Sequence, residues 1–561
     1  MGFKTLLLLA AASGALVSAA SAAPRQWAKA ATGTRVTVGT GNVAVIQPPV
    51  AHPDEAPCVV SLYRNAVFGG NNVNFTYTPP ASCPGPYATI VLSVDISLNA
   101  GIQYDRTGTI WVGGVPFWFG TTAEPSPTQA PSWHFERNVT DYTSTLASAQ
   151  SGFVLIANYT NPTDTSLITS SATLKFYPAT ASAPAPRVPD VVIPLNPGGG
   201  TVALGNSSSV LNLTTSLPKN IASAAMDVYL QSQSGDEFWY TCVPTALAGE
   251  LESCGGGTGR EGEISIDGTP AGAAPVTPWI YTGGIDPYLW SPIPGAQTLN
   301  FNPFRVELSP FAGVLSNGAS HTFGLSVFGA NNYFSVAGAL LLYLDPNTTQ
   351  VTGSVTKNTL TATPTFTVGN NLVSTASAVK GHVYTTEARN FEIDGSVATS
   401  AGTTNYAVKQ SINFKNNQYF KVTASSEQQD IEQNTATVVQ AIAAGPTKTV
   451  TRVTTHTDPL SVMINFAQGP KGNGSQLTKI TQNFVDTNVV LDGLTVAAKS
   501  YVGNMITTQD RLRFNSSFNI TGNSGQASSA SFLRTVTGEP CYGLSLTSSE
   551  GILTSATPGC Q

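Results

Sequence analysis

The sequence has few charges and lacks several motifs that mark common classes of protein. Asp, Glu, Lys and Arg make up 10% of its 561 residues, against about 25% in an average domain. The formal net charge is −6, which argues against nucleic acid or an anionic membrane as a partner. Cys-x-x-Cys pairs and the Gly-x-Ser-x-Gly motif are absent, and the five histidines stand apart. We therefore expect no metal, no cofactor and no serine nucleophile of the hydrolase type.

Long apolar runs are also missing beyond the N-terminal segment. Residues 1–22 contain Lys4, an apolar stretch over residues 6–17 and then small residues, which is the pattern of a secretory signal peptide. No later run approaches the about 18 apolar residues that a transmembrane helix needs. We expect a secreted protein, extracellular or in the lumen of the secretory pathway or vacuole, with an N-terminal extension over residues 23–54 and no membrane anchor.

Cysteines and glycosylation sequons fit this compartment. The most economical pairing joins cysteines that are close in sequence: Cys58 with Cys83, Cys242 with Cys254, and Cys541 with Cys560. Nine Asn-x-Ser/Thr sequons stand at Asn74, Asn138, Asn158, Asn206, Asn212, Asn347, Asn473, Asn515 and Asn519. In a secretory chain they predict a glycosylated surface.

The residue pattern indicates an all-β protein. Short runs such as residues 88–96 and 225–231 alternate apolar and polar residues and end near Gly, Pro or Asn, as half-buried strands do. Long helices are scarce, and residues 427–444 fit either a helix or a strand.

Part of this pattern is repeated. Residues 104–114 return in a weaker form as residues 259–268, with an arginine, alternating apolar residues and a glycine turn in both. Residues 135–146 likewise resemble residues 304–315. Two related antiparallel units packed as jelly rolls are the simplest account.

The domains expected from the repeat follow one another along the chain. They are a first jelly-roll domain over residues 55–185, a Pro-rich linker over 186–197, a second jelly-roll domain over 198–345, and an additional β-rich C-terminal domain over 350–561.

The copies differ at one position that suggests chemistry. Asp105 in the first copy faces Gly259 in the second, so the shared strand and turn form without a carboxylate there. Arg106 would hold the Asp105 carboxyl ionised. The simpler interpretation is an ordinary ion pair at a strand end, since ion pairs outnumber catalytic acids.

Further candidates are acids and aromatic residues. Asp236 and Glu237 are adjacent, so at most one of them can enter a given cleft from a strand. Trp239 is either a core residue or a wall on which a sugar ring stacks. Glu124 is a third possible acid, and the loop of Trp290 is expected to expose that ring.

The motifs in which these candidates occur form an ordered set between residues 55 and 345. They are Gly101-Ile102-Gln103-Tyr104-Asp105-Arg106, the Gly113-Gly114 turn, Thr121-Thr122-Ala123-Glu124-Pro125, Trp133, Asp236-Glu237-Phe238-Trp239-Tyr240, Ile266-Asp267-Gly268, Ile280-Tyr281-Thr282-Gly283-Gly284-Ile285-Asp286-Pro287-Tyr288-Leu289-Trp290 and Leu344-Asp345. The set resembles the peptide-N-glycosidase A family, the plant and fungal glycopeptide amidases.

A fainter resemblance extends to the bacterial PNGase F type, which has two jelly rolls and an active site between them. It implies that Asp105 is the main catalytic residue and that Glu237 is the catalytic glutamate of the second domain. That type has another glutamate on the strand corresponding to residues 153–158, where this chain has no acid. Either Glu124 replaces it or two carboxylates suffice.

The resemblance implies hydrolysis of the amide that joins Asn to the first N-acetylglucosamine of an N-glycan, on a glycopeptide or glycoprotein. Asp105 would be the general base and Glu237 the group that positions and protonates, while Arg106, Glu124, Asp236, Trp239 and Trp290 would contact substrate. Two other classes stay open: a carbohydrate-binding protein without catalysis, and a glycoside hydrolase, which also uses two carboxylates.

Overall fold

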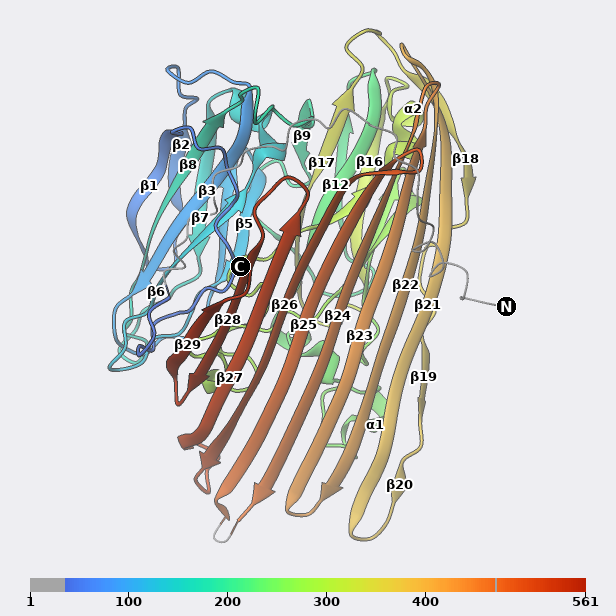
Figure 1. Cartoon of the computed structure of the whole chain (residues 1–561). Coiled ribbons are helices and arrows are strands. Elements are labelled where there is room, and N and C mark those ends of the chain that lie inside the picture. Colours follow the sequence, from blue (N-terminus) through green and yellow to red (C-terminus); the bar gives the residue numbers. More distant parts are fainter. Residues whose placement is uncertain (1–35, 470–471, 561) are drawn as a thin grey trace, which may run out of the picture.

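The computed structural model describes residues 36–469 and 472–560 and is built almost entirely of antiparallel strands (Figure 1). The prediction of an all-β fold is confirmed. The expected signal peptide, residues 1–22, lies outside the described residues. Among the residues that are described, no helix has the length and apolar character to cross a membrane.

The first unit consists of strands β1 to β8, arranged as two four-stranded sheets. Their bounds are β1 Cys58–Phe68, β2 Val73–Tyr77, β3 Tyr87–Leu98, β4 Thr107–Val112, β5 Val115–Thr121, β6 Ser132–Asn138, β7 Gln150–Ile156 and β8 Ile168–Pro178, with 3-10 turns η1 Thr140–Tyr142 and η2 Thr145–Ala147 after β6. The sheet orders are β1-β8-β3-β6 and β2-β7-β4-β5. Apolar residues of both sheets, among them Leu92, Ile110 and Leu174, are fully buried in a shared core.

The second unit repeats this arrangement with strands β10 to β17. Their bounds are β10 Val202–Leu204, β11 Val210–Ser216, β12 Ile221–Ser232, β13 Glu261–Ile266, β14 Thr269–Pro275, β15 Phe304–Glu307, β16 Ser320–Phe328 and β17 Phe334–Leu344. Its short helical elements are η3 Ser234–Asp236, η4 Trp239–Thr241, α1 Thr245–Ala248, η5 Pro287–Trp290, η6 Ser309–Phe311 and α2 Ala312–Leu315. The sheet orders are β10-β17-β12-β15 and β11-β16-β13-β14. Each order matches that of the first unit strand for strand, so the expected duplication is confirmed.

The repeated motif is the hairpin at the centre of each unit. Gly113 and Gly114 turn β4 into β5 with φ of 57° and 79°, and Asp267 and Gly268 turn β13 into β14 with φ of 51° and 77°. Two successive positive φ values define the turn type that suits the twist of a two-residue hairpin. At the other end of the second hairpin, the ring of Phe366 occupies the space beside Gly259, so that a Cβ there would come within 2.9 Å of it.

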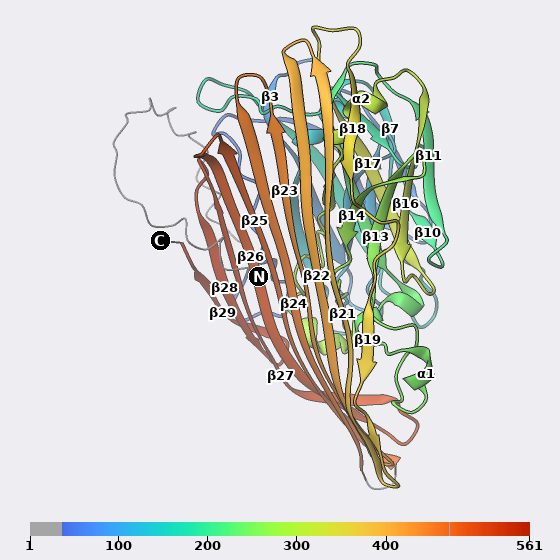
Figure 2. The same ribbon diagram turned by 90° about the vertical axis from the view of Figure 1, so that its right-hand side faces the viewer.

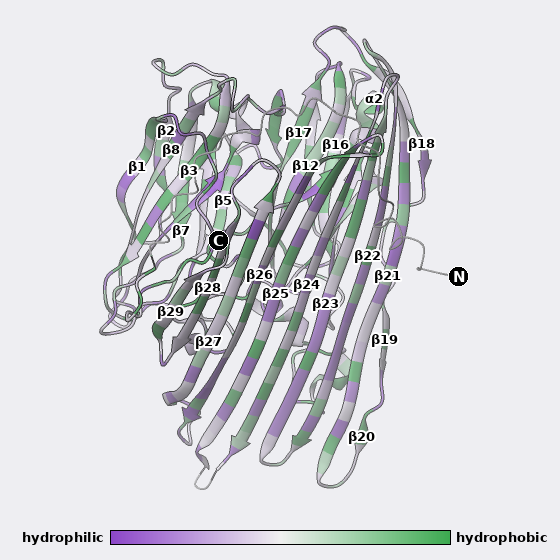
Figure 3. Ribbon diagram, viewed as in Figure 1, coloured by the Kyte–Doolittle hydropathy of each residue, from purple (hydrophilic) through white to green (hydrophobic). Residues whose placement is uncertain are grey.

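The C-terminal sheet is one antiparallel sheet of 12 strands, β18 to β29. Their bounds are β18 Thr352–Asn358, β19 Thr367–Asn370, β20 Val373–Ser374, β21 Ala378–Thr399, β22 Gly402–Thr423, β23 Ser426–Ala444, β24 Thr449–Gln468, β25 Gly474–Asp492, β26 Thr495–Phe514, β27 Ile520–Val536, β28 Tyr542–Ser549 and β29 Ile552–Pro558. The segment that fitted a helix or a strand is thus a strand, β23. Alternating hydropathy along these strands gives the sheet an inner and an outer face (Figure 3).

The inner face of the C-terminal sheet covers the second unit (Figures 1 and 2). Its apolar residues, such as Phe414 and Ile480, join the core of the second unit. Its amide side chains donate to main-chain carbonyls of that unit: Asn416 to Tyr240 at 2.9 Å, Gln418 to Cys242 at 2.8 Å, and Gln410 to Ala273 at 2.9 Å. Main-chain carbonyls that would otherwise be buried without a donor are satisfied in this way.

Connecting segments also join the layers. Strand β9, Val191–Pro194, lies in the expected linker and pairs with β17. Between the two units, Trp111, Phe119, Tyr229 and Trp279 form a small separate core. The boundaries expected for the domains remain predictions.

All three predicted disulfides are present, joining Cys58 to Cys83, Cys242 to Cys254, and Cys541 to Cys560. One predicted glycosylation site does not fit the fold. Asn158 is 0% exposed, and its amide donates to the carbonyls of Phe68 and Ser166 at 3.1 and 3.3 Å. A glycan cannot occupy this side chain in the folded protein.

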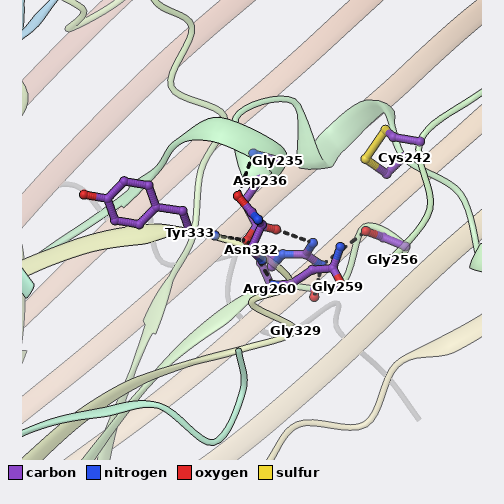
Figure 4. Close-up of polar contacts among 12 residues, drawn as sticks. Gly235, Asp236, Cys242, Gly256, Gly259, Arg260, Gly329, Asn332 and Tyr333 are labelled. Carbon is purple, nitrogen blue, oxygen red and sulfur yellow. Dashed lines mark hydrogen bonds and ion pairs between the residues drawn. A yellow bond between two sulfur atoms is a disulfide. The ribbon is translucent and has the colours of Figure 1, made fainter. Parts of the chain in front are cut away.

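Asp236 is the centre of a buried polar node in the second unit (Figure 4). One carboxylate oxygen accepts from Arg260 at 2.8 Å, and the other accepts from the backbone N–H groups of Asn331, Asn332 and Tyr333 at 2.7–2.9 Å. These bonds tie η3, the start of β13 and the turn before β17 together. The pKa of Asp236 is lowered by the Arg260 and backbone hydrogen bonds, which outweigh its burial.

We predict that Arg260→Ala destabilises the fold strongly, because it leaves the buried Asp236 carboxylate without its cation. Removing one partner of a buried ion pair costs about 3–5 kcal/mol. Arg187→Ala is the matched control, because Arg187 is 58% exposed and pairs with Asp190, and exposed pairs contribute about 0–1 kcal/mol. Thermal and urea unfolding measure both variants, and equal losses would contradict the prediction.

Candidate functional site

Asp105 lies just before β4, at an end of the first unit, and is half-buried. The chain around it is fixed against the end of β5. The Arg106 N–H donates to the Thr122 hydroxyl and the Thr122 N–H donates to the Arg106 carbonyl, both at 2.9 Å. This pairing continues the β4–β5 ladder by one step and aims Asp105 away from the core of the first unit.

Glu124 follows β5 and lies against Asp105. The Asp105 N–H donates to Glu124 Oε1 at 3.0 Å, and the two carboxyl groups are hydrogen-bonded to each other. The sequence left open whether a third acid exists. In the structure Glu124 lies beside Asp105, and residues 153–158 carry no acid.

Gly283 brings the second unit into the site. It lies in the site loop, residues 276–303 between β14 and β15, and its backbone N–H lowers the pKa of the adjacent Asp105 carboxyl. A Cβ at this position would come within 2.3 Å of Glu124 and 2.8 Å of Asp105, so the close approach requires glycine. The neighbouring Thr282 hydroxyl donates to the Thr122 carbonyl at 2.6 Å. Sequence reasoning missed this donor, for which the only signal was the Gly283-Gly284 pair.

Glu237 comes from the second unit and directly follows η3, which the Asp236 node holds in place. Glu237 lies near enough to Asp105 for the charge of Asp105 to raise its pKa. A contact beside it joins the units: Gln233 Nε2 donates to the Thr107 hydroxyl at 3.1 Å. The structure therefore brings together Asp105, Glu124 and Glu237, which are distant in sequence.

The electrostatics of the cluster favour protonated acids near neutral pH. Burial and the neighbouring Asp105 raise the pKa of Glu124 to about 8, and burial and Asp105 raise that of Glu237 to about 7. Burial also raises the pKa of Asp105, while hydrogen bonds from Glu124 and Gly283 and the charge of Arg106 oppose the rise. A cluster of this kind holds a proton acceptor and proton donors together, as general acid–base chemistry requires.

Arg106 has a smaller effect on Asp105 than the sequence suggested. Its charge lowers the pKa of Asp105, but burial outweighs it and the net direction is upward. The guanidinium donates to Gln103 Oε1 at 2.6 Å, and Gln103 in turn donates to Asn158. Arg106 Nε is buried and has no hydrogen-bond partner among the described residues.

Three residues expected to contact substrate are buried instead. Asp236 is 0% exposed because its carboxylate is the centre of the buried node. Trp239 is also 0% exposed and packs against Phe414 of the C-terminal sheet. Trp290 is 3% exposed, and its ring N–H donates to the Gly284 carbonyl at 2.8 Å. Neither ring offers a face to a sugar, and the exposed aromatic residue next to the acids is Tyr104 at 58%.

Within residues 36–469 and 472–560, no group of three or more His, Cys, Asp or Glu side chains is arranged to hold a metal ion.

Comparisons with known proteins cover most of the two units. The family model of the peptide N-acetyl-β-D-glucosaminyl asparaginase amidase A matches residues 49–361. Peptide-N4-(N-acetyl-beta-glucosaminyl)asparagine amidase A of Prunus dulcis is 30% identical over 378 residues, which are 63% of this chain. The chain spans 65% of the length of this relative.

Two solved structures were also similar. PNGase F, a glycosylasparaginase from Flavobacterium meningosepticum, is 13% identical with a TM-score of 0.34, over 52% of this chain and 96% of its own. PNGF-II is 13% identical with a TM-score of 0.35, over 52% of this chain and 66% of its own.

The family model spans more than half of the chain, including Asp105, Glu124, Glu237 and Gly283. The chain therefore belongs to the peptide N-acetyl-β-D-glucosaminyl asparaginase amidase A family.

Proposed function

We propose that the protein hydrolyses the amide bond between Asn and the first N-acetylglucosamine of N-glycans, on glycopeptides or glycoproteins. The observation that carries the proposal is the cluster of three acids, Asp105, Glu124 and Glu237, which two units of a chain in the amidase family assemble from distant segments. The products are a glycosylamine, which later loses ammonia, and a peptide in which Asn has become Asp.

The proposed chemistry assigns a separate role to each acid. Asp105 takes a proton from a water molecule as that water attacks the amide carbonyl carbon. Glu237, which burial and Asp105 keep protonated up to about pH 7, gives its proton to the departing nitrogen. Glu124 donates a hydrogen bond to Asp105 and so favours its ionised form. The charge of Arg106 also lowers the pKa of Asp105 and so favours its ionised form.

The disulfides of the chain indicate the compartment in which the reaction takes place. Three disulfides suit the oxidising secretory lumen or the extracellular medium. We therefore propose a secreted or vacuolar enzyme that meets glycoproteins where they are exported or degraded. Nucleic acid and membranes are not expected as partners, given the net charge of −6.

The first prediction of this proposal concerns the products. A glycopeptide incubated with the protein in heavy-oxygen water is expected to yield a peptide in which Asn has become Asp and carries the heavy oxygen. Mass spectrometry separates the alternatives: a glycoside hydrolase leaves a sugar on Asn, and a carbohydrate-binding protein leaves the glycopeptide unchanged.

Asp105→Asn is expected to lower kcat/KM about 100- to 10,000-fold, whereas Asp492→Asn, on an exposed hairpin, retains activity. Near-normal activity of Asp105→Asn would contradict the assignment.

The second prediction concerns pH. Because Glu237 acts in its protonated form and its pKa is about 7, kcat/KM should fall as pH rises through about 7. Glu237→Gln cannot supply a proton, so kcat should drop and the fall near pH 7 should disappear from the pH profile. An unchanged alkaline limb in this variant would assign that limb to another group.

The third prediction concerns Glu124, whose pKa of about 8 leaves it neutral at pH 7. Glu124→Gln keeps a donor for the Asp105 carboxylate and an acceptor for the Asp105 N–H, so activity should stay close to that of the unchanged protein. Glu124→Ala loses a hydrogen bond to a charged group, worth about 1.5–3 kcal/mol, and should lower kcat/KM about 10- to 100-fold. Equal losses in the two variants would mean that Glu124 itself transfers a proton.

A further inference from the structure

The site loop faces the acids on one side and the C-terminal sheet on the other. Its inner side supplies Gly283 and Thr282 to the site. Its outer side rests on side chains of β25, β26 and β27. Gln482 of β25 donates from Nε2 to the Pro278 carbonyl at 3.1 Å and accepts at Oε1 from the Ala296 N–H at 3.0 Å. The hydroxyls of Thr508 and Ser528 donate to the Leu289 carbonyl at 2.7 and 3.2 Å. Gln526 Nε2 donates to the Ser291 carbonyl at 3.0 Å.

A pair of buried carboxyl groups joins the loop to the sheet at the point nearest Gly283. Asp286 of the loop and Asp510 of β26 are both 0% exposed and are hydrogen-bonded to each other. Two carboxylates cannot both be ionised at such a contact, so the pair holds a proton between them. Asp510 is further faced by the Asn523 amide at 3.0 Å and by the charge of Glu550.

Asp286 connects this pair to Gly283 through a short and well-bonded stretch of chain. Its carboxylate accepts from the Tyr288 N–H at 3.0 Å, and its own N–H donates to the Gly284 carbonyl at 2.8 Å. The same carbonyl accepts from the Trp290 ring at 2.8 Å. Ile285, between the two, has a φ of 67°, a conformation that costs about 1 kcal/mol or more for such a residue. The strained turn keeps its shape only because these contacts hold it.

We propose that Asp510 of the C-terminal sheet is a positioning residue for the acid cluster, acting through Asp286 to hold the Gly283 N–H on the Asp105 carboxylate. The expected change in kcat and in the pH profile rests on the proposed amidase function. The expected displacement of Gly283 rests only on the contacts between the site loop and the sheet. It assigns a role to a sheet that supplies no acid to the cluster.

The role has a specific electrostatic signature. The hydrogen bond from Gly283 stabilises the ionised form of Asp105 and lowers its pKa. Loss of this bond moves the acid limb of the kcat/KM profile to higher pH. It also displaces a group that orients the base, and small misplacements at a reacting centre cost up to about 100-fold. A loss of global stability alone would lower the melting temperature without moving the pH profile.

The test compares three variants of the full-length protein. Asp510→Ala removes the contact to Asp286, and Asp510→Asn replaces it with an amide that can donate to the Asp286 carboxylate. Glu387→Ala is the matched control, because Glu387 is also a buried acid on the inner face of the sheet, at 7% exposed, but lies near Glu263 and outside the site loop. For each, kcat and the pH profile of kcat/KM are measured on one glycopeptide, and hydrogen–deuterium exchange is measured across residues 276–303.

Asp510→Ala is expected to lower kcat about 10- to 100-fold, to move the acid limb to higher pH and to speed exchange at the Gly283 amide. Asp510→Asn and Glu387→Ala should keep the profile and the protection of that amide. An unchanged acid limb and unchanged protection in Asp510→Ala would overturn the inference. If the unchanged protein released no glycan, the amidase proposal would fail, while the exchange data would still decide whether Asp510 holds Gly283.

Discussion

The close approach of the Gly283 backbone to the Asp105 carboxylate is the contact on which the rest of the site depends. The two residues belong to different units, so the contact forms only when the two units are docked. It also sets the distance between the site loop and Glu124, because no side chain fits at position 283. The small aromatic core around Phe119 and Tyr229 and the Gln233–Thr107 bond are the other contacts that keep the units in this relation.

Three acids held this close lower the stability of the folded chain, since burial and mutual repulsion both oppose their ionised forms. The protein accommodates them by raising the pKa of Glu124 to about 8 and that of Glu237 to about 7, and with donors directed at Asp105. Asp236 shows the contrasting solution. It is next to Glu237 in sequence, yet Arg260 and three backbone donors lower its pKa despite its burial. The two adjacent carboxyl groups therefore have different roles: Asp236 is structural, and Glu237 belongs to the acid cluster.

Much of the architecture follows from local sequence patterns. Alternating apolar residues, the two glycine turns and the repeated arginine were sufficient to predict an all-β fold with a duplication, and the short spacing of the cysteines predicted their pairing. The one carboxylate that the two copies do not share pointed to Asp105, and the family resemblance pointed to Glu237. The Gly283 donor escaped because a backbone N–H carries no residue signature. Trp290 and Asn158 were expected at the surface and are buried, and of the two interpretations of Trp239 the core residue holds. Burial is decided by segments distant in sequence, such as the C-terminal sheet for Trp239 and the carbonyls of Phe68 and Ser166 for Asn158.

The duplication also shows why only the first copy can place an aspartate at the start of the repeated hairpin. The position equivalent to Asp105 is Gly259, and the ring of Phe366 fills the space above it. That ring stacks on Phe328 at 5.7 Å and meets Phe414 edge-on at the same separation. The space beside Gly259 is therefore filled by the segment that joins β18 to β19 of the C-terminal sheet. The two copies of one scaffold have therefore diverged at this position, and an aspartate placed at position 259 would meet the Phe366 ring where Asp105 meets Glu124 and Gly283.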